Sequence, residues 1–326
     1  MKKIQLVIVS PALADANNGN WQTARRWQKM LSVHHATRIT QHWPDAHSAD
    51  DDIMIALHAR RSAPAIAAWA AQRGNAGLAV VLTGTDLYRD IALDASAQQS
   101  LALAHKLVVL QALGAQALPD SVRAKATVIF QSTPSRLPAR KTGQHLRAVM
   151  VGHLRDEKDP LTLMAAARAL PPGRAILIDH IGAPLDPVLA TAAQATAYDC
   201  PIYRWLGGLP HEATRRRIQR AHLLVHTSRM EGGAHVLMEA ICSGTPVLAS
   251  RIAGNVGMLG EDYGGYFEPG DAEALARLLM LARETQDQAD GLLYRLSRQC
   301  MQRAPLFTPQ TEQQHLLDMV ASLRKN

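Results

Sequence analysis

The sequence predicts two α/β domains, each a doubly wound parallel sheet with helices on both faces. Short apolar runs alternate with longer segments of helical periodicity along the whole chain, which is the pattern of repeated βαβ units. Several of these runs are continuously apolar, as expected for strands that are covered on both faces. The length of 326 residues favours two domains, at about 150 residues per domain.

The first half of the chain contains the elements of the first domain. Its expected strands are Lys3–Val9, Ala36–Thr40, Asp52–Leu57, Leu78–Thr83, Lys106–Leu110 and Thr127–Phe130. Its expected helices are Trp21–Val33, Ala63–Gln72 and Ala95–His105. The opening run follows two lysines like a secretion signal, but its apolar core is short and no small-residue cleavage site follows. We therefore expect it to be a buried strand.

A break in the alternation begins at Ser132. Residues 132–143 are rich in proline, serine and charged residues and have no apolar period, which is typical of a linker. We therefore predict an N-terminal domain over residues 1–133, a linker over 134–145 and a C-terminal domain over 146–306.

The alternation of strands and helices starts again after the linker. The expected strands are Leu146–Val151, Arg174–Asp179, Pro201–Trp205, Leu223–Thr227 and Pro246–Ser250. The expected helices are Pro160–Ala169, Pro187–Ala197, Glu212–Arg220, His235–Ser243, Ala272–Glu284, Gly291–Met301 and Pro309–Leu323. Ligands of such sheets bind beyond the carboxyl ends of the strands, so two facing sheets imply a cleft between the domains.

The composition argues against several classes of protein. The net charge is +7, but the basic clusters are scattered and carry no nucleic-acid motif, so no nucleic-acid partner is expected. No apolar run reaches the ~18 residues of a membrane span, so no stable membrane association is expected. The three cysteines form no CxxC pair, which argues against a disulfide framework and a zinc ribbon and favours a cytoplasmic setting.

The most informative stretch is residues 227–247, a predicted strand, glycine-rich turn and helix. Gly232 and Gly233 let backbone N–H groups approach a ligand closely, and the helix start behind them favours negative charge. Glu231 and Glu239 are eight residues apart, which is up to roughly 12 Å along a helix. That span is comparable to the distance from ribose to sugar in a nucleotide sugar, so each carboxylate can accept hydrogen bonds from one end.

This block resembles the E-x7-E region of retaining glycosyltransferases of the GT-B fold, family four in particular. The resemblance implies that Glu231 orients the donor sugar and Glu239 fixes the ribose, with no tightly held metal or cofactor. It also implies that the last helix, within residues 307–326, packs back on the N-terminal domain. The structural alternative is two solvated glutamates at a helix start, where acids are favoured.

A second match covers residues 149–160. This segment resembles the family's first C-terminal strand and the following loop, whose basic residues bind the donor diphosphate. Lys158 stands at the family's lysine, whereas the usual arginine is replaced by His153, and Arg155 could supply the missing guanidinium. The implied catalytic residues are Lys158, Glu231 and Arg155. The implied donor-binding residues are Gly19, Gly152, His153, Trp205, Gly232, Gly233, Ala234 and Glu239.

The acceptor side departs from the family pattern. After the second glutamate the family usually has Gly-Gly-x-x-Glu, but residues 253–257 contain no acid. In place of the histidine that often follows the acceptor-side strand, residues 82–90 carry two threonines and two aspartates. Polar residues at predicted strand ends are the candidate acceptor contacts: Asn18, Asn20, His58, Arg60, Thr85 and Asp86. Each alone could be an ordinary loop residue, and His58 could equally be a satisfied buried histidine.

Three segments, 57–62, 82–88 and 151–160, resemble a distinct branch, the selenosugar synthases of selenoneine biosynthesis. These GT-B enzymes join selenium from selenophosphate to the sugar of UDP-GlcNAc or UDP-glucose. An anionic selenium nucleophile needs no general base, while its phosphate needs cations such as Arg60. The alternatives are a carbohydrate, small-molecule or lipid acceptor, a nucleotide-sugar epimerase, or a non-catalytic nucleotide-sugar-binding protein.

Overall fold

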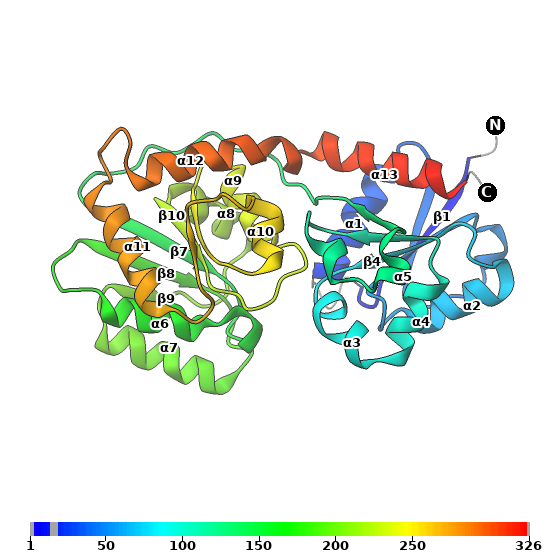
Figure 1. Ribbon diagram of the computed structural model, residues 1–326, viewed down its shortest axis with the longest axis horizontal. Helices are drawn as coiled ribbons and strands as arrows, with labels where there is room; N and C mark the ends of the chain where they lie inside the picture. The colour runs from blue at the N-terminus through cyan, green and yellow to red at the C-terminus, as the bar shows by residue number, and fades with distance from the viewer. Residues whose placement is uncertain (1–2, 14–18, 325–326) are drawn as a thin grey trace. The chain divides into compact units, whose positions relative to one another are not determined.

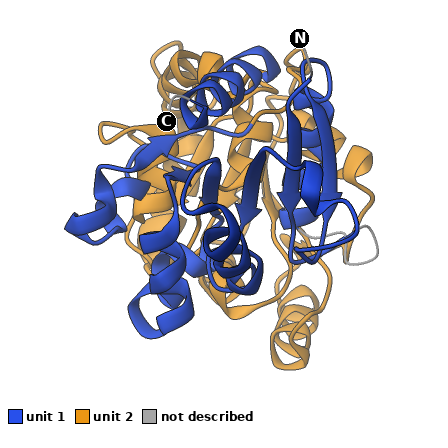
Figure 2. Ribbon diagram, turned by 90° about the vertical axis from the view of Figure 1, so that its right-hand side faces the viewer, with its two compact units in different colours: residues 1–131, 309–326 blue, residues 132–308 orange. Residues whose placement is uncertain are grey.

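The chain forms two compact units, which Figure 2 colours separately. In a computed structural model that describes residues 3–13 and 19–324, unit 1 comprises Met1–Gln131 with Pro309–Asn326, and unit 2 comprises Ser132–Thr308. Each unit contains one six-stranded sheet (Figure 1). Every strand pairing within the two sheets is parallel. The predicted fold class, two doubly wound parallel α/β sheets, is therefore confirmed.

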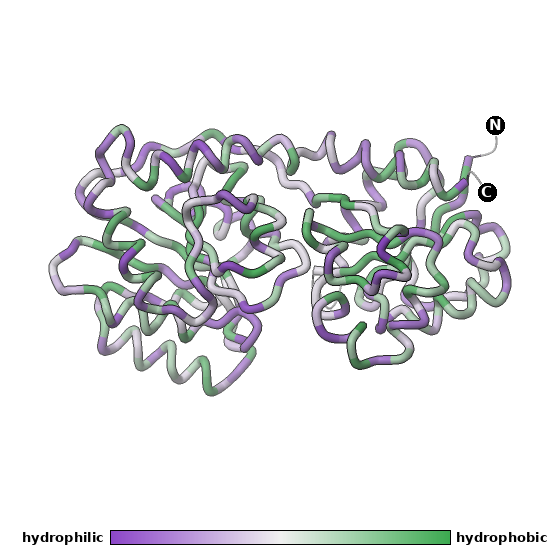
Figure 3. The backbone as a smooth tube through the Cα atoms, viewed as in Figure 1, coloured by the Kyte–Doolittle hydropathy of each residue, from purple (hydrophilic) through white to green (hydrophobic). Residues whose placement is uncertain are grey.

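The sheet of unit 1 has the strand order β2-β1-β3-β4-β5-β6. Its strands are β1 Gln5–Val9, β2 Ala36–Thr40, β3 Ile53–Leu57, β4 Leu78–Leu82, β5 Lys106–Val109 and β6 Ala126–Val128. Its helices are α1 Gly19–Leu31, α2 Ala63–Arg73, α3 Ile91–Leu93, α4 Ala95–Leu103, α5 Asp120–Arg123 and α13 Pro309–Leu323, with short turns η1 Ser48–Asp50, η2 Asp86–Asp90 and η3 Gly114–Ala117. The central strands β3 and β4 are buried along their whole length, as their continuous apolar sequences predict. Figure 3, which colours the backbone by hydropathy, shows apolar segments around the place of β4.

The last helix, α13, belongs to unit 1. Leu316 and Val320 of α13 share a core cluster with Trp27 of α1. Glu312 of α13 is fully buried, and its carboxylate accepts hydrogen bonds from Trp27 Nε1 at 2.6 Å and from Arg26 Nε at 3.1 Å. A buried carboxylate needs such charged and polar partners. These contacts explain why this helix packs on α1.

The sheet of unit 2 has the strand order β12-β11-β10-β7-β8-β9. Its strands are β7 Leu146–Val151, β8 Ile176–Ile181, β9 Tyr203–Trp205, β10 Leu223–His226, β11 Val247–Ser250 and β12 Tyr266–Phe267. Its helices are α6 Pro160–Ala169, α7 Pro187–Asp199, α8 His211–Arg220, α9 His235–Ile241, α10 Ala253–Leu259, α11 Ala272–Glu284 and α12 Leu292–Arg303, with turns η4 Asp156–Lys158 and η5 Ala304–Phe307. Within residues 3–13 and 19–324, no helix combines the length and apolarity that a bilayer span requires.

Three elements of unit 2 differ from the sequence prediction: the bounds of β8, and α10 and β12, which were not expected. The strand expected over residues 174–179 lies instead at Ile176–Ile181, so Asp179 is inside the sheet rather than at its end. Its carboxylate is compensated by Arg147 at 3.0 Å and by Arg204 at 2.9 Å, which makes a buried strand position tolerable for an acid. Helix α10 contains two glycines, which give it a low intrinsic helix propensity that packing overrides.

Candidate functional site

The two sequence motifs of unit 2 lie at the same edge of its sheet. The loop that begins at Gly152 follows β7, and the turn that contains Glu231 follows β10. These strands are neighbours and run parallel, so their carboxyl ends meet at one edge, where ligands of doubly wound sheets bind. The structure brings the two motifs into direct contact.

That contact is an ion pair between Lys158 Nζ and Glu231 Oε1. Only 15% of the Lys158 side chain and 12% of the Glu231 side chain is exposed. His226, the last residue of β10, places Nε2 3.3 Å from the same Glu231 oxygen. Burial alone would raise the pKa of Glu231, but the Lys158 ammonium and the His226 imidazole outweigh it and hold that pKa well below its usual range. Burial lowers the pKa of His226, so the site at neutral pH is an ammonium–carboxylate pair beside a neutral imidazole.

The backbone fixes this pair from both sides. Thr227 Oγ1 donates to the Lys158 carbonyl at 2.8 Å, and the Arg229 N–H donates to the Glu157 carbonyl at 2.9 Å. Arg229 Nε also lies 3.2 Å from the carboxylate of Asp159. The lysine loop and the glutamate turn are therefore held together before any ligand is bound.

Helix α10 contains the acid-free segment 253–257 and supports the turn that carries Glu231. A Cβ on Gly254 would lie 2.1 Å from the carbonyl oxygen of Glu231, so only glycine allows this close approach. Asn255 is fully buried, and its Nδ2 donates to the Ser250 carbonyl at 2.9 Å. Ser250 Oγ in turn donates to the carbonyl of Ser228. The residues of this acid-free segment therefore position the turn.

A buried histidine holds the backbone of the first motif. His180 Nε2 donates to the Gly152 carbonyl at 3.1 Å, while its Nδ1 accepts from the Tyr203 hydroxyl at 2.8 Å. Burial lowers the pKa of His180 to about 4, so the ring is neutral at pH 7. His153 Nδ1 accepts from the Ala183 N–H at 3.0 Å, which turns the other ring nitrogen of His153 into the donor.

Two predicted donor-site residues have other contacts in the structure. Arg155 is about half exposed, and its Nε lies 3.9 Å from the Glu157 carboxylate; no described contact joins it to Lys158 or Glu231. The half-buried Trp205 donates from Nε1 to the Gly182 carbonyl at 2.9 Å. Their roles toward a donor stay predictions.

The second glutamate of the motif, Glu239, lies on the seven-residue helix α9. Its side chain is 7% exposed, and Oε1 lies 2.6 Å from His211 Nε2 and 3.7 Å from His235 Nδ1. The hydrogen bond that His211 donates to the Glu239 carboxylate raises the pKa of His211. Gly232, Gly233 and the buried Ala234 lead into this helix, so their backbone separates the two glutamates.

In unit 1 a polar cluster lies where β3 and β4 end. His58 follows β3, is 2% exposed and has a φ of 74°, a backbone region that costs energy for a residue with a side chain and occurs preferentially at functional sites. Its Nδ1 accepts from the Arg61 N–H at 3.3 Å, and its Nε2 lies 3.2 Å from Thr85 Oγ1. Burial lowers the pKa of His58, although Asp86 opposes the shift.

Asp86 and Arg60 complete this cluster with different roles. Asp86 is fully buried, and its carboxylate accepts from the N–H groups of Ala59 at 3.0 Å, Thr83 at 2.8 Å and Gly84 at 2.9 Å. It therefore ties the two strand ends together. Arg60 is 41% exposed and donates from Nε to Asp90 Oδ2 at 2.9 Å, so the N–H groups of its two terminal nitrogens take no part in this contact.

The first βα turn requires a correction. Gly19 and Asn20 were expected in a loop before a helix at residue 21, but α1 begins at Gly19, so both lie in its first turn. Thr23 Oγ1 donates to the Gly19 carbonyl at 2.8 Å, which satisfies a backbone group of that turn. Asn18 lies outside the described residues.

Sequence reasoning missed three polar residues of these clusters. His226 could have been found as the single polar residue of an otherwise apolar strand, and Asp90 as a second acid four residues after Asp86. His211 follows a proline at a helix start and gives no such signal.

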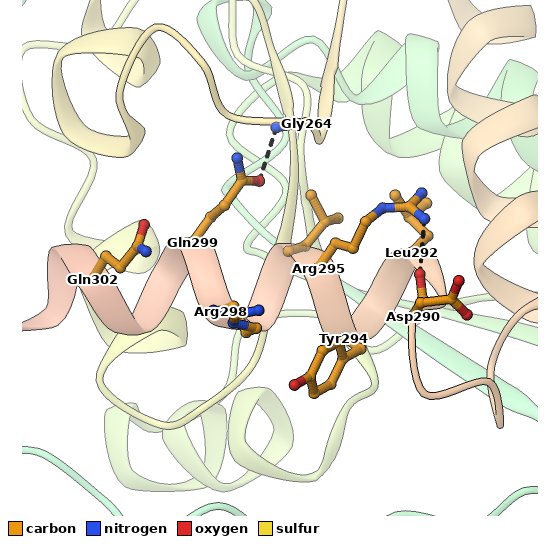
Figure 4. Close-up of a pocket in the computed structure, with 9 residues that line it drawn as sticks. Gly264, Asp290, Leu292, Tyr294, Arg295, Arg298, Gln299 and Gln302 are labelled. Atoms are coloured by element: carbon orange, nitrogen blue, oxygen red, sulfur yellow. Dashed lines mark hydrogen bonds between the residues drawn. The ribbon is translucent and has the colours of Figure 1, made fainter.

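Other features of the described residues lie apart from these clusters. Among residues 3–13 and 19–324, no three histidine, cysteine or acidic side chains are grouped to hold a metal ion. A surface cavity of about 450 Å³ lies along α12. Figure 4 shows its lining residues, among them Gly264, Arg295 and Gln299. Gly264 precedes β12, so this cavity is at the amino edge of the sheet and not beside Lys158.

Comparison with solved structures defines the class of this fold. A glycosyltransferase from Rickettsia africae has a TM-score of 0.76 at 15% identity, with both chains covered fully. Sucrose-phosphate synthase from Thermosynechococcus elongatus has a TM-score of 0.74 at 17% identity, with 99% of each chain covered. Anabaena HepE in complex with UDP-glucose has a TM-score of 0.70 at 15% identity, covering 98% of this chain and 100% of that one. The predicted GT-B fold is confirmed.

A similarity in sequence to a known family is found in unit 2. Residues 136–295 match the family model described as glycosyl transferases group 1. A search among curated proteins finds no match. Within unit 2, residues 136–295 are therefore similar in sequence to the group 1 glycosyl transferases.

Proposed function

We propose that the protein transfers a sugar from a UDP-sugar to selenophosphate. The observation that supports binding of the UDP-sugar donor is the largely buried Lys158–Glu231 pair at the carboxyl edge of the sheet of unit 2. Glu239 lies on the short helix α9 that follows Glu231. Solved structures of similar fold include HepE in complex with UDP and glucose and with UDP-glucose. That ligand class matches a site with one cation for phosphate and two carboxylates for sugar hydroxyls.

In the proposed reaction, the cationic and the anionic residues of the donor site have different roles. When the bond between the sugar and UDP breaks, negative charge builds on the leaving phosphate oxygen, and the Lys158 ammonium neutralises it. Glu231, whose pKa is held low, stays an ionised acceptor that orients the donor sugar. Glu239 accepts from the ribose hydroxyls. The proposed reaction uses no resident metal or cofactor, so EDTA should leave turnover unchanged.

The acceptor half rests on the sequence resemblance to selenosugar synthases and on the chemistry of unit 1. Selenium of selenophosphate attacks the anomeric carbon, the C–Se bond forms, and the C–O bond to UDP breaks with the electron pair leaving on UDP. This nucleophile needs no general base, in agreement with an acid-free segment at residues 253–257. We assign the phosphate of the acceptor to Arg60, whose guanidinium is partly exposed beside the strained His58.

Product analysis tests this proposal. UDP-GlcNAc and UDP-glucose are incubated with the protein with and without selenophosphate, and the products are analysed by mass spectrometry. We expect UDP release and a selenium-containing sugar only when selenophosphate is present. Release that requires a carbohydrate or lipid acceptor, or an epimerised UDP-sugar formed without acceptor, would replace this assignment with the corresponding one.

Two variants separate the halves of the proposal. Lys158→Ala should abolish turnover, whereas a non-catalytic binding protein has no turnover to lose. Arg60→Ala should raise the KM for selenophosphate and leave the KM for the donor unchanged. The exposed neighbour Arg61 provides the matched control, Arg61→Ala. Equal effects of the two arginine variants would overturn the assignment of Arg60.

A further inference from the structure

We propose that His211 is a positioning residue that sets ribose recognition by holding Glu239 through one carboxylate oxygen. This inference rests on the proposed function, in which Glu239 accepts from the ribose hydroxyls of the donor. It adds a residue from a different helix, α8, to the donor site. No motif of the sequence points to this residue.

The geometry of Glu239 is asymmetric. His211 Nε2 is 2.6 Å and His235 Nδ1 is 3.7 Å from the same oxygen, Oε1. Both imidazoles therefore address one side of the carboxylate, and the side chain is only 7% exposed. A carboxylate has about four acceptor directions on its two oxygens. Fixing Oε1 in this way presents Oε2 as the acceptor for two adjacent hydroxyls.

The His211 ring can orient the Glu239 carboxylate without being part of the hydrophobic core. Its side chain is 74% exposed, so removing it opens no cavity in the core. Its helix is nevertheless fixed, because the buried Arg215 on α8 donates to Thr133 Oγ1 and, at 3.0 Å, to the Pro134 carbonyl. A rigid helix carrying an exposed ring on a buried carboxylate fixes the rotamer of Glu239.

The charges around the pair favour a charge-assisted bond. Glu239 raises the pKa of His211 most strongly, Arg215 opposes this shift, and Glu212 supports it. Hydrogen bonds that involve an ionised partner are shorter and stronger than neutral ones. The orienting contact is therefore firm while His211 is protonated and is weakened, but not lost, in the neutral ring.

The test compares UDP with 2′-deoxy-UDP, which lacks the hydroxyl that a ribose-binding carboxylate recognises. Calorimetry on the full chain measures both affinities in the wild type, His211→Ala, His211→Gln and Glu239→Gln. We expect the wild type to prefer UDP, and His211→Ala to reduce that preference by about tenfold. His211→Gln, whose amide can still donate to Oε1, should restore part of it, and Glu239→Gln should reduce it further than His211→Ala.

The matched control is Arg216→Ala on the same helix, which is 67% exposed and pairs with Glu212 rather than Glu239; it should leave the preference unchanged. Three outcomes overturn the inference: an unchanged preference in His211→Ala, equal losses of affinity for the two nucleotides, or an unchanged preference in Glu239→Gln. If the wild type binds neither nucleotide, the proposed function itself fails, which is a distinct result.

Discussion

Replacing Lys158 with methionine removes the cation from the buried pair and keeps a side chain of similar length. Among the described residues, Glu231, which is 12% exposed, then keeps His226 Nε2 at 3.3 Å from Oε1 as its remaining ion-pair partner. Breaking a buried ion pair by removing one partner costs about 3–5 kcal/mol. Because both side chains keep a small exposure, we expect unit 2 to lose about 2–4 kcal/mol of its free energy of unfolding.

The same replacement changes the titration of the site in a defined direction. In the wild type, Lys158 is one of the groups that lower the pKa of His226. Without it, His226 binds a proton more readily as the pH falls toward its ordinary range, and the resulting imidazolium pairs with Glu231. The destabilisation of Lys158→Met should therefore be smaller at pH 5.5 than at pH 8.

A double-mutant cycle with Glu231→Gln isolates the interaction. Unfolding of unit 2 is followed in a urea titration by the fluorescence of Trp205, the tryptophan of that unit. The other tryptophans are replaced by phenylalanine in every variant, so that they do not contribute to the signal. We expect the double variant to be more stable than the sum of the single losses predicts, with a coupling of about 2 kcal/mol. Additive losses within about 0.5 kcal/mol would refute the reasoning, because they would show that the pair does not act as a unit.

Three further predictions concern the supports of the site and of unit 1. Gly254→Ala places a Cβ 2.1 Å from the Glu231 carbonyl oxygen and should reduce kcat at least tenfold with folding intact by circular dichroism; full activity would contradict the close contact. His180 has a pKa of about 4 against an ordinary 6.5, so as the pH falls the unfolded chain binds a proton at this residue before the folded chain does. Between pH 7 and 5 this difference should lower the free energy of unfolding by about 2 kcal/mol. In urea titrations, His180→Asn should lack this pH-dependent loss. Glu312→Leu leaves the Trp27 indole N–H unpaired and should destabilise unit 1 by about 2–4 kcal/mol, measured by calorimetry, whereas Glu312→Gln should cost less; equal losses would show that only packing volume matters.

Sequence reasoning predicted the fold well because buried parallel strands have a distinctive composition. The continuous apolar runs of β3 and β4 indicate strands that are buried on both faces. The glycines after Glu231 mark the turn between its strand and its helix. It failed where tertiary contacts decide. Asp179 inside β8 is tolerated only because arginines from other strands reach it.

The candidate site shows the same limit. The sequence places Lys158 and Glu231 in separate loops, and only the parallel pairing of β7 and β10 brings them into contact. His211 reaches Glu239 from a neighbouring helix, and that proximity has no periodicity or motif to reveal it. Similarly, the positive φ of His58 depends on the packing around it and cannot be read from its residue type.

The return of α13 to unit 1 has a consequence for the order in which the chain can mature on the ribosome. Residues 1–131 emerge while the part of α1 that contacts α13 is still uncovered, and the Trp27 indole N–H lacks the Glu312 carboxylate that accepts its hydrogen bond. Unit 2 is synthesised entirely before that gap is closed. Unit 1 therefore stays incompletely packed until α13 is synthesised. A chain that ends within α13 should expose unit 1, rather than unit 2, to chaperones and proteases.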